Sequence, residues 1–432
     1  MSRAEGAVQS RLGAADLVRI SAFAFGLSGI AGAFGGLLLP IRLLDVAPEE
    51  LKNSYLGILT FLGLLLAMAT QPVVGAFSDA GSGRWGRRPF IVAGSLAACV
   101  ALVAVGFAPT YAALLAAYLL LQLSSNVAQA PYQAVIPDLV SRKELGRASA
   151  AKGIAETLGA IVCVGIITIP MDRYSSGRGA GWLWASLAVL GLMVLVSTAL
   201  TMAGIRRRRQ HGAVTAPPEG KGGLFRVDWR AAPGLPWLLL SRLFAFMAIS
   251  SVGTFGFYLM QDYFKFERPT TVWATVIMVV AACVLVLAYP AALVSDRVGR
   301  KPLLILAAAL SAAAFAWLLL AQSYLAVLVA ALALGATTAV FYGVNWALAT
   351  ELVPRERSAY YLGLLNFSVA GGSALARLSG TAIDALNRWR DGAGYTSLIA
   401  ACVAYSLLSG LFLLKAPARR RTPPATRQPK SA

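Results

Sequence analysis

Charged side chains inside apolar runs are the residues of this sequence best suited to do chemistry. Lys152 and Glu156 lie one helical turn apart in the run 148–170, so their side chains can pair. A charge inside a membrane-spanning helix costs roughly 2.5–3.5 kcal/mol and usually marks a function. Glu156 lies near the middle of its run by length, and the pair therefore predicts a proton-coupling site. A structural ion pair remains the alternative.

Polar uncharged side chains extend this set. Four amides, spaced by four, three and four residues, share one face of the run 111–136: Gln122, Asn126, Gln129 and Gln133. Further candidates lie in later apolar runs: Arg242, Tyr342, Asn345, Trp346 and Asn366. Amides can bond sugar hydroxyls, and aromatic rings can cover a sugar ring, so the set predicts a sugar-binding site. Hydrogen bonding between helices explains the amides equally well.

The sequence contains no residue pattern that is typical of an enzyme active site. No glycine-rich phosphate loop is present, and serine, histidine and acidic residues do not converge in the sequence. The four cysteines all lie in apolar runs without metal-type spacing, and the single histidine, His211, lies in a polar stretch. We therefore expect no enzyme activity, no metal and no cofactor.

The elements that must position these residues are apolar runs of membrane-spanning length. Of the 432 residues 58% are hydrophobic and only 13% are charged, against about 25% charged in soluble domains. Twelve runs reach about the 20 residues that a spanning helix needs. They are 17–41, 54–77, 88–108, 111–136, 148–170, 180–204, 235–260, 270–294, 302–320, 323–348, 358–380 and 393–415. The sequence predicts an all-α membrane protein with twelve transmembrane helices.

A basic turn appears twice in the sequence. The first copy holds Gly75 and Asp79 and ends on Arg87, Arg88 and Pro89. The second copy, some 217 residues later, holds Asp296, Arg297, Gly299, Arg300 and Lys301. A second pair of matching landmarks, Asp138 and Glu351, lies 213 residues apart. The offsets predict two parallel six-helix repeats.

These repeats define the expected domains. A first bundle spans residues 1–204, a basic cytoplasmic linker 205–234, a second bundle 235–415 and a basic cytoplasmic tail 416–432. Two parallel six-helix halves are one of the known transporter architectures, in which the substrate site lies near the midplane between the halves.

The basic turns are candidates for a cytoplasmic gate. Asp79 or Asp296 can lie at the N-terminus of a helix from the other half, where the helix dipole favours negative charge. Asp138 and Glu351 can form ion pairs with the arginines of the turns, which are Arg87, Arg88, Arg297 and Arg300. The alternative is that these residues only set the orientation of the chain.

The orientation follows from the lysines and arginines. With both termini in the cytoplasm, inner segments carry 26 of the 38 and outer loops carry 8, which satisfies the positive-inside rule. The net charge of +19 is therefore a membrane signal, and we expect no nucleic-acid partner. We expect a monomer in the plasma membrane, surrounded by lipid.

The motifs resemble those of the major facilitator superfamily of transporters. That family's loop signature is Gly-x-x-x-Asp-Arg-x-Gly-Arg-Arg/Lys, and Asp296 to Lys301 match it, although Ala292 replaces the leading glycine. The longer first copy resembles the turn of sucrose/proton symporters and of the related glycoside–cation symporters. So do the segment 71–75, and Asn126 with Pro131 and Asp138. Related carriers bind sodium through aspartates in the second span, which this chain lacks.

The resemblance implies proton-coupled uptake of a sugar or glycoside by alternating access. One alternative is a drug/proton exporter, which prefers a larger apolar cavity with an acidic residue and fewer amides. Another is a pigment-delivery or membrane assembly factor built on the same fold, which needs no proton site.

Overall fold

The helices of this protein follow its apolar runs. The computed structural model describes residues 13–80, 87–141, 144–207, 234–352 and 358–416, and within these ranges it contains helices and short connections but no strand. Helices suit such sequences because a backbone in lipid must satisfy its own hydrogen bonds.

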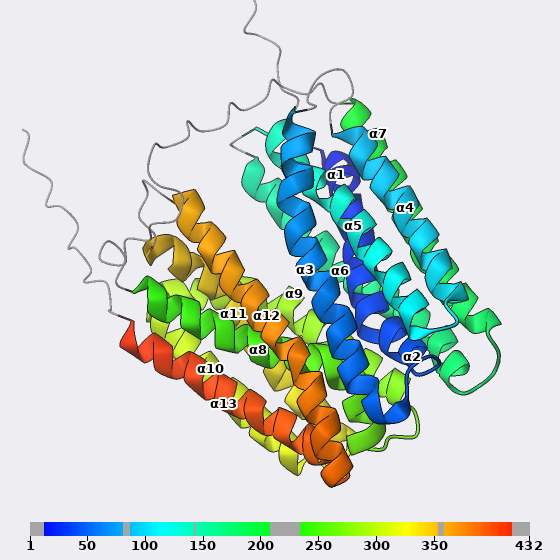
Figure 1. Ribbon diagram of the computed structural model, residues 1–432. Helices are drawn as coiled ribbons and strands as arrows, with labels where there is room; N and C mark the ends of the chain where they lie inside the picture. The colour runs from blue at the N-terminus through cyan, green and yellow to red at the C-terminus, as the bar shows by residue number, and fades with distance from the viewer. Residues whose placement is uncertain (1–12, 81–86, 142–143, 208–233, 353–357, 417–432) are drawn as a thin grey trace, which may run out of the picture.

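The first bundle, at the upper right of Figure 1, contains six helical segments. They are α1 (Ala14–Gly29), continued by η1 (Ile30–Leu38) and α2 (Leu39–Leu43); α3 (Lys52–Ala80), after the short η2 (Glu49–Leu51); α4 (Arg88–Phe107); α5 (Tyr111–Leu139); α6 (Leu145–Ser175); and α7 (Gly181–Arg207).

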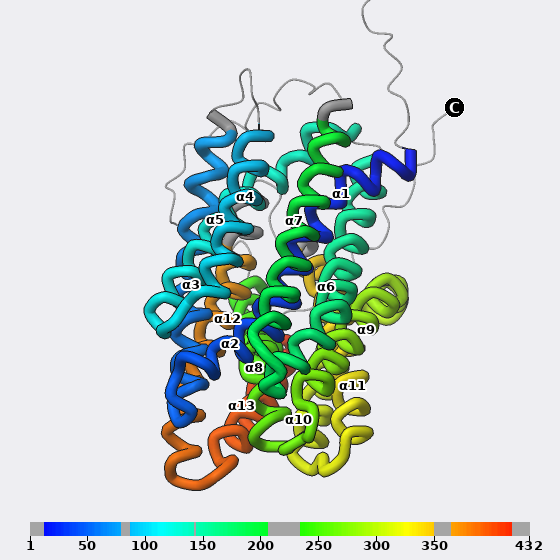
Figure 2. Tube along the Cα trace, turned by 90° about the vertical axis from the view of Figure 1, so that its right-hand side faces the viewer, coloured from blue at the N-terminus to red at the C-terminus, as the bar shows by residue number. Residues whose placement is uncertain are grey.

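The second bundle also contains six segments and lies at an angle to the first. They are α8 (Leu235–Tyr258), continued by η3 (Leu259–Tyr263); α9 (Pro269–Val298); α10 (Arg300–Leu320); α11 (Tyr324–Leu352); α12 (Ser358–Trp389); and α13 (Ala393–Lys415). Figure 2 shows the two bundles from the side.

Eleven of the segments in the described ranges are long and apolar enough to cross a membrane. The remaining long helix, α12, has 32 residues but is less apolar, and it packs against α3 and α8. The prediction of an all-helical membrane protein is confirmed. Several helices extend past the predicted runs, because polar residues at their ends continue the helix beyond the apolar stretch.

Glycine decides where α9 ends and α10 begins. Gly299 has φ of 104° and ψ of 143°, a conformation that residues with a Cβ rarely adopt. The second basic turn is therefore a single-residue break between two spanning helices. This conformation explains why the turn holds a glycine next to Arg300.

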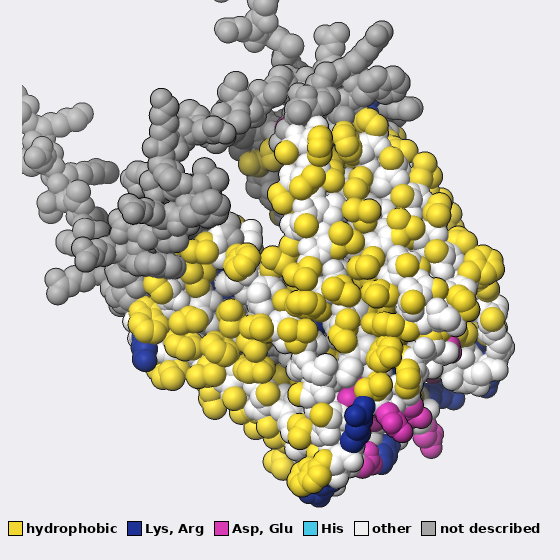
Figure 3. Space-filling view, viewed as in Figure 1, with side chains coloured by type: hydrophobic (Ala, Val, Ile, Leu, Met, Phe, Trp, Pro, Cys, Tyr) yellow, Lys and Arg dark blue, Asp and Glu magenta, His cyan; other side chains and the backbone are white. Residues whose placement is uncertain are grey.

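The lateral surface of the molecule is apolar. Figure 3 shows hydrophobic side chains over the faces of both bundles, with Lys, Arg, Asp and Glu gathered at the lower end. Many large hydrophobic side chains on the helices are exposed, for example Leu320 at 77% and Tyr289 at 73%. Such a surface suits contact with lipid tails.

The two bundles meet at one end and diverge at the other. The start of α3 and the end of α12 lie side by side at the lower end of Figure 1, which we call the far end. The end of α3 and the start of α12 lie apart at the opposite end, near Arg87 and Arg300, which we call the basic-turn end. Hydrogen bonds join the two bundles at the far end, for example that from Asn53 to Asp384.

Candidate functional site

A cavity of about 990 Å³ lies between the two bundles. Both bundles line it, the first through α1, η1, α3, α5 and α6 and the second through α8 to α13. Its size falls at the upper end of the range for small-molecule sites. Because its walls belong to both bundles, any movement of one bundle against the other changes its shape.

The amide face of α5 contributes to this cavity. Asn126 and Gln129 line it, as does Gln122, whose Nε2 lies 2.6 Å from the hydroxyl of Tyr118. Gln71 of α3 donates from Nε2 to Asn126 Oδ1 at 2.7 Å and reaches Gln129 Oε1 at 3.4 Å. The amides are thus both cavity lining and a bridge between helices, so the two interpretations of this stripe are compatible.

The second bundle contributes aromatic side chains to the cavity lining. Tyr342 and Trp273 line the cavity, and Trp273 donates from Nε1 to the carbonyl of Gly36 in the first bundle at 2.8 Å. Gly36 belongs to η1, a π-helical stretch, and π-helical turns inside helices are frequent at functional sites. Together with the amides of α5, these aromatic faces can bind a ring that carries hydroxyls.

Glu156 lines the cavity, and Lys152 lies beside it. Lys152 Nζ is 3.1 Å from Glu156 Oε1, which is the pairing that the spacing predicts. The side chain of Glu156 is 42% exposed, so in this conformation the carboxylate faces an open cavity rather than a dry interior.

Five residues of the predicted substrate set do not line the cavity. The Arg242 Nη1 donates to Asn345 Oδ1, and the guanidinium lies 5.9 Å from the centre of the Trp346 ring. Arg242 and Asn345 are both buried, and they stabilise the packing of α8 against α11 behind the cavity wall. Gln133 and Asn366 are exposed and lie outside the lining.

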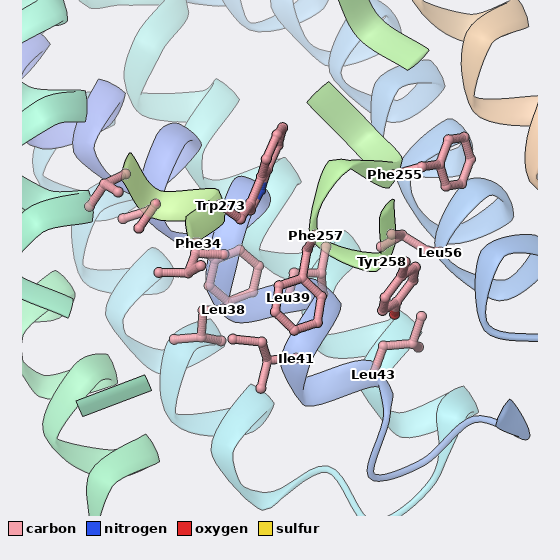
Figure 4. Close-up of a cluster of buried hydrophobic side chains, with 14 of the residues drawn as sticks. Phe34, Leu38, Leu39, Ile41, Leu43, Leu56, Phe255, Phe257, Tyr258 and Trp273 are labelled. Carbon is pink, nitrogen blue, oxygen red and sulfur yellow. The ribbon is translucent and has the colours of Figure 1, made fainter. Parts of the chain in front are cut away.

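An apolar cluster closes the cavity at its far end. Figure 4 shows side chains of both bundles packed together there. Phe34, Leu38, Leu39 and Ile41 come from the first bundle, and Phe257 and Tyr258 come from the second. Tyr258 also donates its hydroxyl to the carbonyl of Pro40 at 2.9 Å. Each of these side chains is at most 2% exposed, so they pack tightly between the bundles at this level.

A polar network lies beyond the apolar cluster and joins the bundles. Three residues at the start of α3 bond three residues of the second bundle, and we call this set the inter-bundle lock: Lys52, Asn53, Ser54, Asp262, Asp384 and Tyr395. Lys52 Nζ lies 2.9 Å from Asp262 Oδ1. Tyr395 donates to Asp262 and lies within hydrogen-bond distance of Asn53.

Asp384 closes the N-terminus of α3 within this lock. Its Oδ2 accepts the backbone N–H of Ser54 at 2.6 Å, and its Oδ1 accepts Asn53 Nδ2 at 2.9 Å. The carboxylate is 3% exposed, and the free N–H groups and dipole at the helix N-terminus stabilise its charge. A carboxylate of one half thus binds a helix terminus of the other half, at the end opposite to the predicted gate.

The basic turns make contacts within their own bundles. Arg87 Nε lies 2.7 Å from Asp138 Oδ2, and Arg88 Nη2 donates to the carbonyl of Ile205 at 3.0 Å. Arg300 donates to the carbonyl of Ala347 at 2.6 Å and lies 3.4 Å from Asp296. Arg297 is exposed, and a Cβ at Gly75 would meet no atom within 4 Å. The side chains of Asp79 and Glu351 lie outside the described part of the chain.

Sequence reasoning missed the inter-bundle lock. Asn53, Asp262 and Asp384 lie at the ends of the predicted runs or just outside them, where polar residues are ordinary. Asp384 lies in a helix that continues past its apolar part. Predicting that continuation from the sequence would have identified Asp384 as a polar residue of the helix. Arg377 of α12, a charge inside the predicted run 358–380, also lines the cavity.

Comparison with known proteins gives a consistent result. The model of the family described as "MFS/sugar transport protein" matches residues 28–357. The sucrose transport protein SUT1 of Oryza sativa subsp. japonica is 28% identical over 183 residues, which span 36% of this chain and 32% of the rice protein. The chain therefore matches about a third of the length of that relative.

Two solved structures share the fold. A D-xylose-proton symporter has a TM-score of 0.72 at 17% identity, covering 93% of this chain and 97% of its own. A bacterial homologue of the human lysosomal transporter Spinster, solved in an inward-facing and occupied conformation, has a TM-score of 0.66 at 15% identity, with 93% and 95% covered.

Proposed function

Because this chain belongs to the MFS/sugar transport protein family, we propose that it takes up a sugar or glycoside together with a proton, by alternating access. The family makes it a membrane transporter of small molecules and not an enzyme. The observation that carries the finer proposal is the cavity shared by both bundles, whose lining includes amides of α5 and aromatic side chains of α9 and α11.

The substrate enters from the far end and leaves at the basic-turn end. In the conformation described here the inter-bundle lock holds the far end closed, and the bundles part between the end of α3 and the start of α12. For loading, the lock must open and the basic-turn end must close. Asp79 and Asp296 then bind helix N-termini of the opposite bundle, as Asp384 does in the present conformation.

Glu156 carries the coupling proton in this proposal. It faces the cavity, and Lys152 competes with the proton for its carboxylate. A change in the Lys152–Glu156 distance between the two conformations alters the proton affinity, which links proton binding to movement of the bundles. A residue at the cavity wall can exchange its proton with whichever side the cavity opens to.

The proposed setting is the plasma membrane, with both termini and the basic turns in the cytoplasm. Both bundles of the chain line the cavity, and in this proposal the protein works as a monomer. This orientation makes the far end the outer face, and the conformation described here is then inward-facing.

Uptake into proteoliposomes tests the proposal. Purified protein should accumulate a labelled sugar or glycoside when the outside is made acidic, and a protonophore should abolish accumulation while exchange of labelled for unlabelled substrate continues. Uptake that ignores the protonophore contradicts proton coupling. Efflux of cationic dyes with no binding of any sugar favours an exporter instead.

A further inference from the structure

Arg377 of α12 is a cation in the cavity wall. Its Nη1 donates to the carbonyl of Ser373 in its own helix at 2.7 Å. Its Nε is covered from solvent and makes no hydrogen bond, and no carboxylate among the described residues forms an ion pair with it. Arg377 lines the cavity, so the N–H groups of Nη1 and Nη2 that Ser373 does not use are the part of the guanidinium that can bind a ligand there.

The charges around the cavity do not balance. Among the described residues, the charged side chains in its lining are those of Glu156 and Arg377, and Glu156 is already paired with Lys152 at 3.1 Å. A guanidinium cannot lose its proton in a protein, so Arg377 cannot avoid the cost of holding a charge away from water by becoming neutral. A charge at membrane depth is expensive and marks a functional site when nothing in the protein compensates it.

We propose that Arg377 binds a carboxylate of the substrate, so that the cargo is a sugar acid or a glycoside bearing a carboxylate. This inference rests on the proposed sugar transport. A planar carboxylate accepts two parallel N–H groups from one edge of a guanidinium, and such bidentate bonds are strong and directional. The single positive charge of one arginine balances the single negative charge of a carboxylate, whereas a phosphate monoester carries nearly two negative charges.

The position of Arg377 connects this site with closure of the far end. A Cβ at Gly57 would lie 2.2 Å from the Arg377 carbonyl, so α3 and α12 touch at this level. Asp384 of the inter-bundle lock follows Arg377 by two helical turns on α12, a rise of about 10.5 Å. A carboxylate bound at Arg377 thus sits at the crossing that must part when the far end opens.

Matched pairs of ligands test the proposal on the purified full-length protein. Each pair differs only in a carboxylate against a hydroxymethyl group: glucuronate and glucose, galacturonate and galactose, phenyl β-D-glucuronide and phenyl β-D-glucoside. A ligand that binds the folded state raises its Tm. We expect at least one acid to raise the Tm and its neutral partner to bind on the order of tenfold more weakly.

The possible failures are distinct. Neutral sugars that raise the Tm while their acids do not would overturn the carboxylate site and leave sugar transport standing. If neither member of any pair raises the Tm while a cationic drug does, the sugar proposal fails and the Arg377 proposal fails with it.

Variants of Arg377 assign the effect to this side chain. Arg377→Gln should abolish the preference for the acid while keeping the affinity for the neutral partner, and Arg377→Lys should retain part of the preference. Arg388→Gln, which removes an exposed arginine from the same helix, should leave the preference unchanged. An undiminished preference for the acid in Arg377→Gln contradicts the site.

The Tm of the ligand-free protein provides an independent test. If the substrate supplies the missing counter-charge, the empty protein holds an uncompensated cation, and Arg377→Met should keep or raise the Tm of the ligand-free protein. A structural role for the guanidinium predicts a lower Tm. A lowered Tm in Arg377→Met, together with an intact acid preference in Arg377→Lys and Arg377→Gln, would overturn the proposal.

Discussion

Lys52 Nζ lies 2.9 Å from Asp262 Oδ1, and this ion pair joins the two bundles at the far end of the molecule. The side chain of Lys52 is 5% exposed and that of Asp262 is 23% exposed, so water screens the pair poorly. Removing one partner of a buried ion pair typically costs about 3–5 kcal/mol, because the other charge is left without compensation. Such an energy is large enough to decide between two conformations.

Charge reversal at this pair should open the far end. Lys52→Asp or Asp262→Lys places like charges together, whereas the double variant restores an attractive pair of opposite direction. Spin labels on cysteines at Glu50 and Arg388, both exposed, should report a longer distance in each single variant and a shorter one in the double variant. The control is Lys265→Asp, because the Lys265–Asp391 pair is largely exposed and contributes about 0–1 kcal/mol. An unchanged distance in both single variants would show that the pair does not hold the bundles together.

A single methyl group at Gly57 should prevent closure of the far end. The Cβ of Gly57→Ala would lie 2.2 Å from the carbonyl of Arg377, and a backbone atom cannot yield as a flexible side chain can. Overpacking of this kind costs about 1–3 kcal/mol. We expect the variant to fold, to favour the conformation open at the far end and to lose most of its transport. Gly146→Ala, where a Cβ meets no atom within 4 Å, serves as the control and should transport normally.

The sequence predicted the helices well because the membrane imposes one solution on each apolar run. A run of about 20 apolar residues must form a helix in lipid, whatever its neighbours are. The spacing of Lys152 and Glu156 likewise predicted a contact within one helix, where geometry depends on sequence separation alone. Local patterns of this kind need no knowledge of tertiary structure.

Contacts between the bundles could not be predicted in the same way. Asn53 and Asp384 are 331 residues apart, and no periodicity connects them. Arg242 and Asn345 had the residue types of a sugar site, but the structure places them behind the cavity wall, where they bond each other. Whether a polar residue of a spanning helix faces a cavity or a neighbouring helix depends on the rotation of that helix in the bundle, which the polar spacing of α8 and α11 did not determine.

The orientation in the membrane is open to a direct test. The lysine and arginine distribution predicts that the turns holding Arg87 and Arg300, and His211 outside the described residues, face the cytoplasm. Single cysteines at these positions in a cysteine-free background should resist an impermeant thiol reagent in intact cells, and a cysteine at Glu50 should react. Labelling of the Arg87 position from outside would reverse the orientation and the assignment of the far end to the outer face.

Glu156→Gln tests proton coupling, because it keeps the shape of the side chain and removes its titration. If Glu156 carries the coupling proton, the variant should lose accumulation driven by a proton gradient and keep exchange of labelled for unlabelled substrate. Glu267→Gln makes the same chemical change at an exposed position of the second bundle and should accumulate substrate normally.

A purely structural pair predicts a different result for the same variant. Lys152 would be left without its partner at 3.1 Å, so Glu156→Gln would lower the yield of folded protein, and replacing Lys152 by Met as well would restore part of it. The exposure of Glu156 at 42% favours the first outcome, since a carboxylate open to the cavity contributes little to stability but can exchange a proton. Normal accumulation by Glu156→Gln would exclude this residue as the proton carrier, and coupling would then have to involve another carboxylate that changes its access between the two conformations.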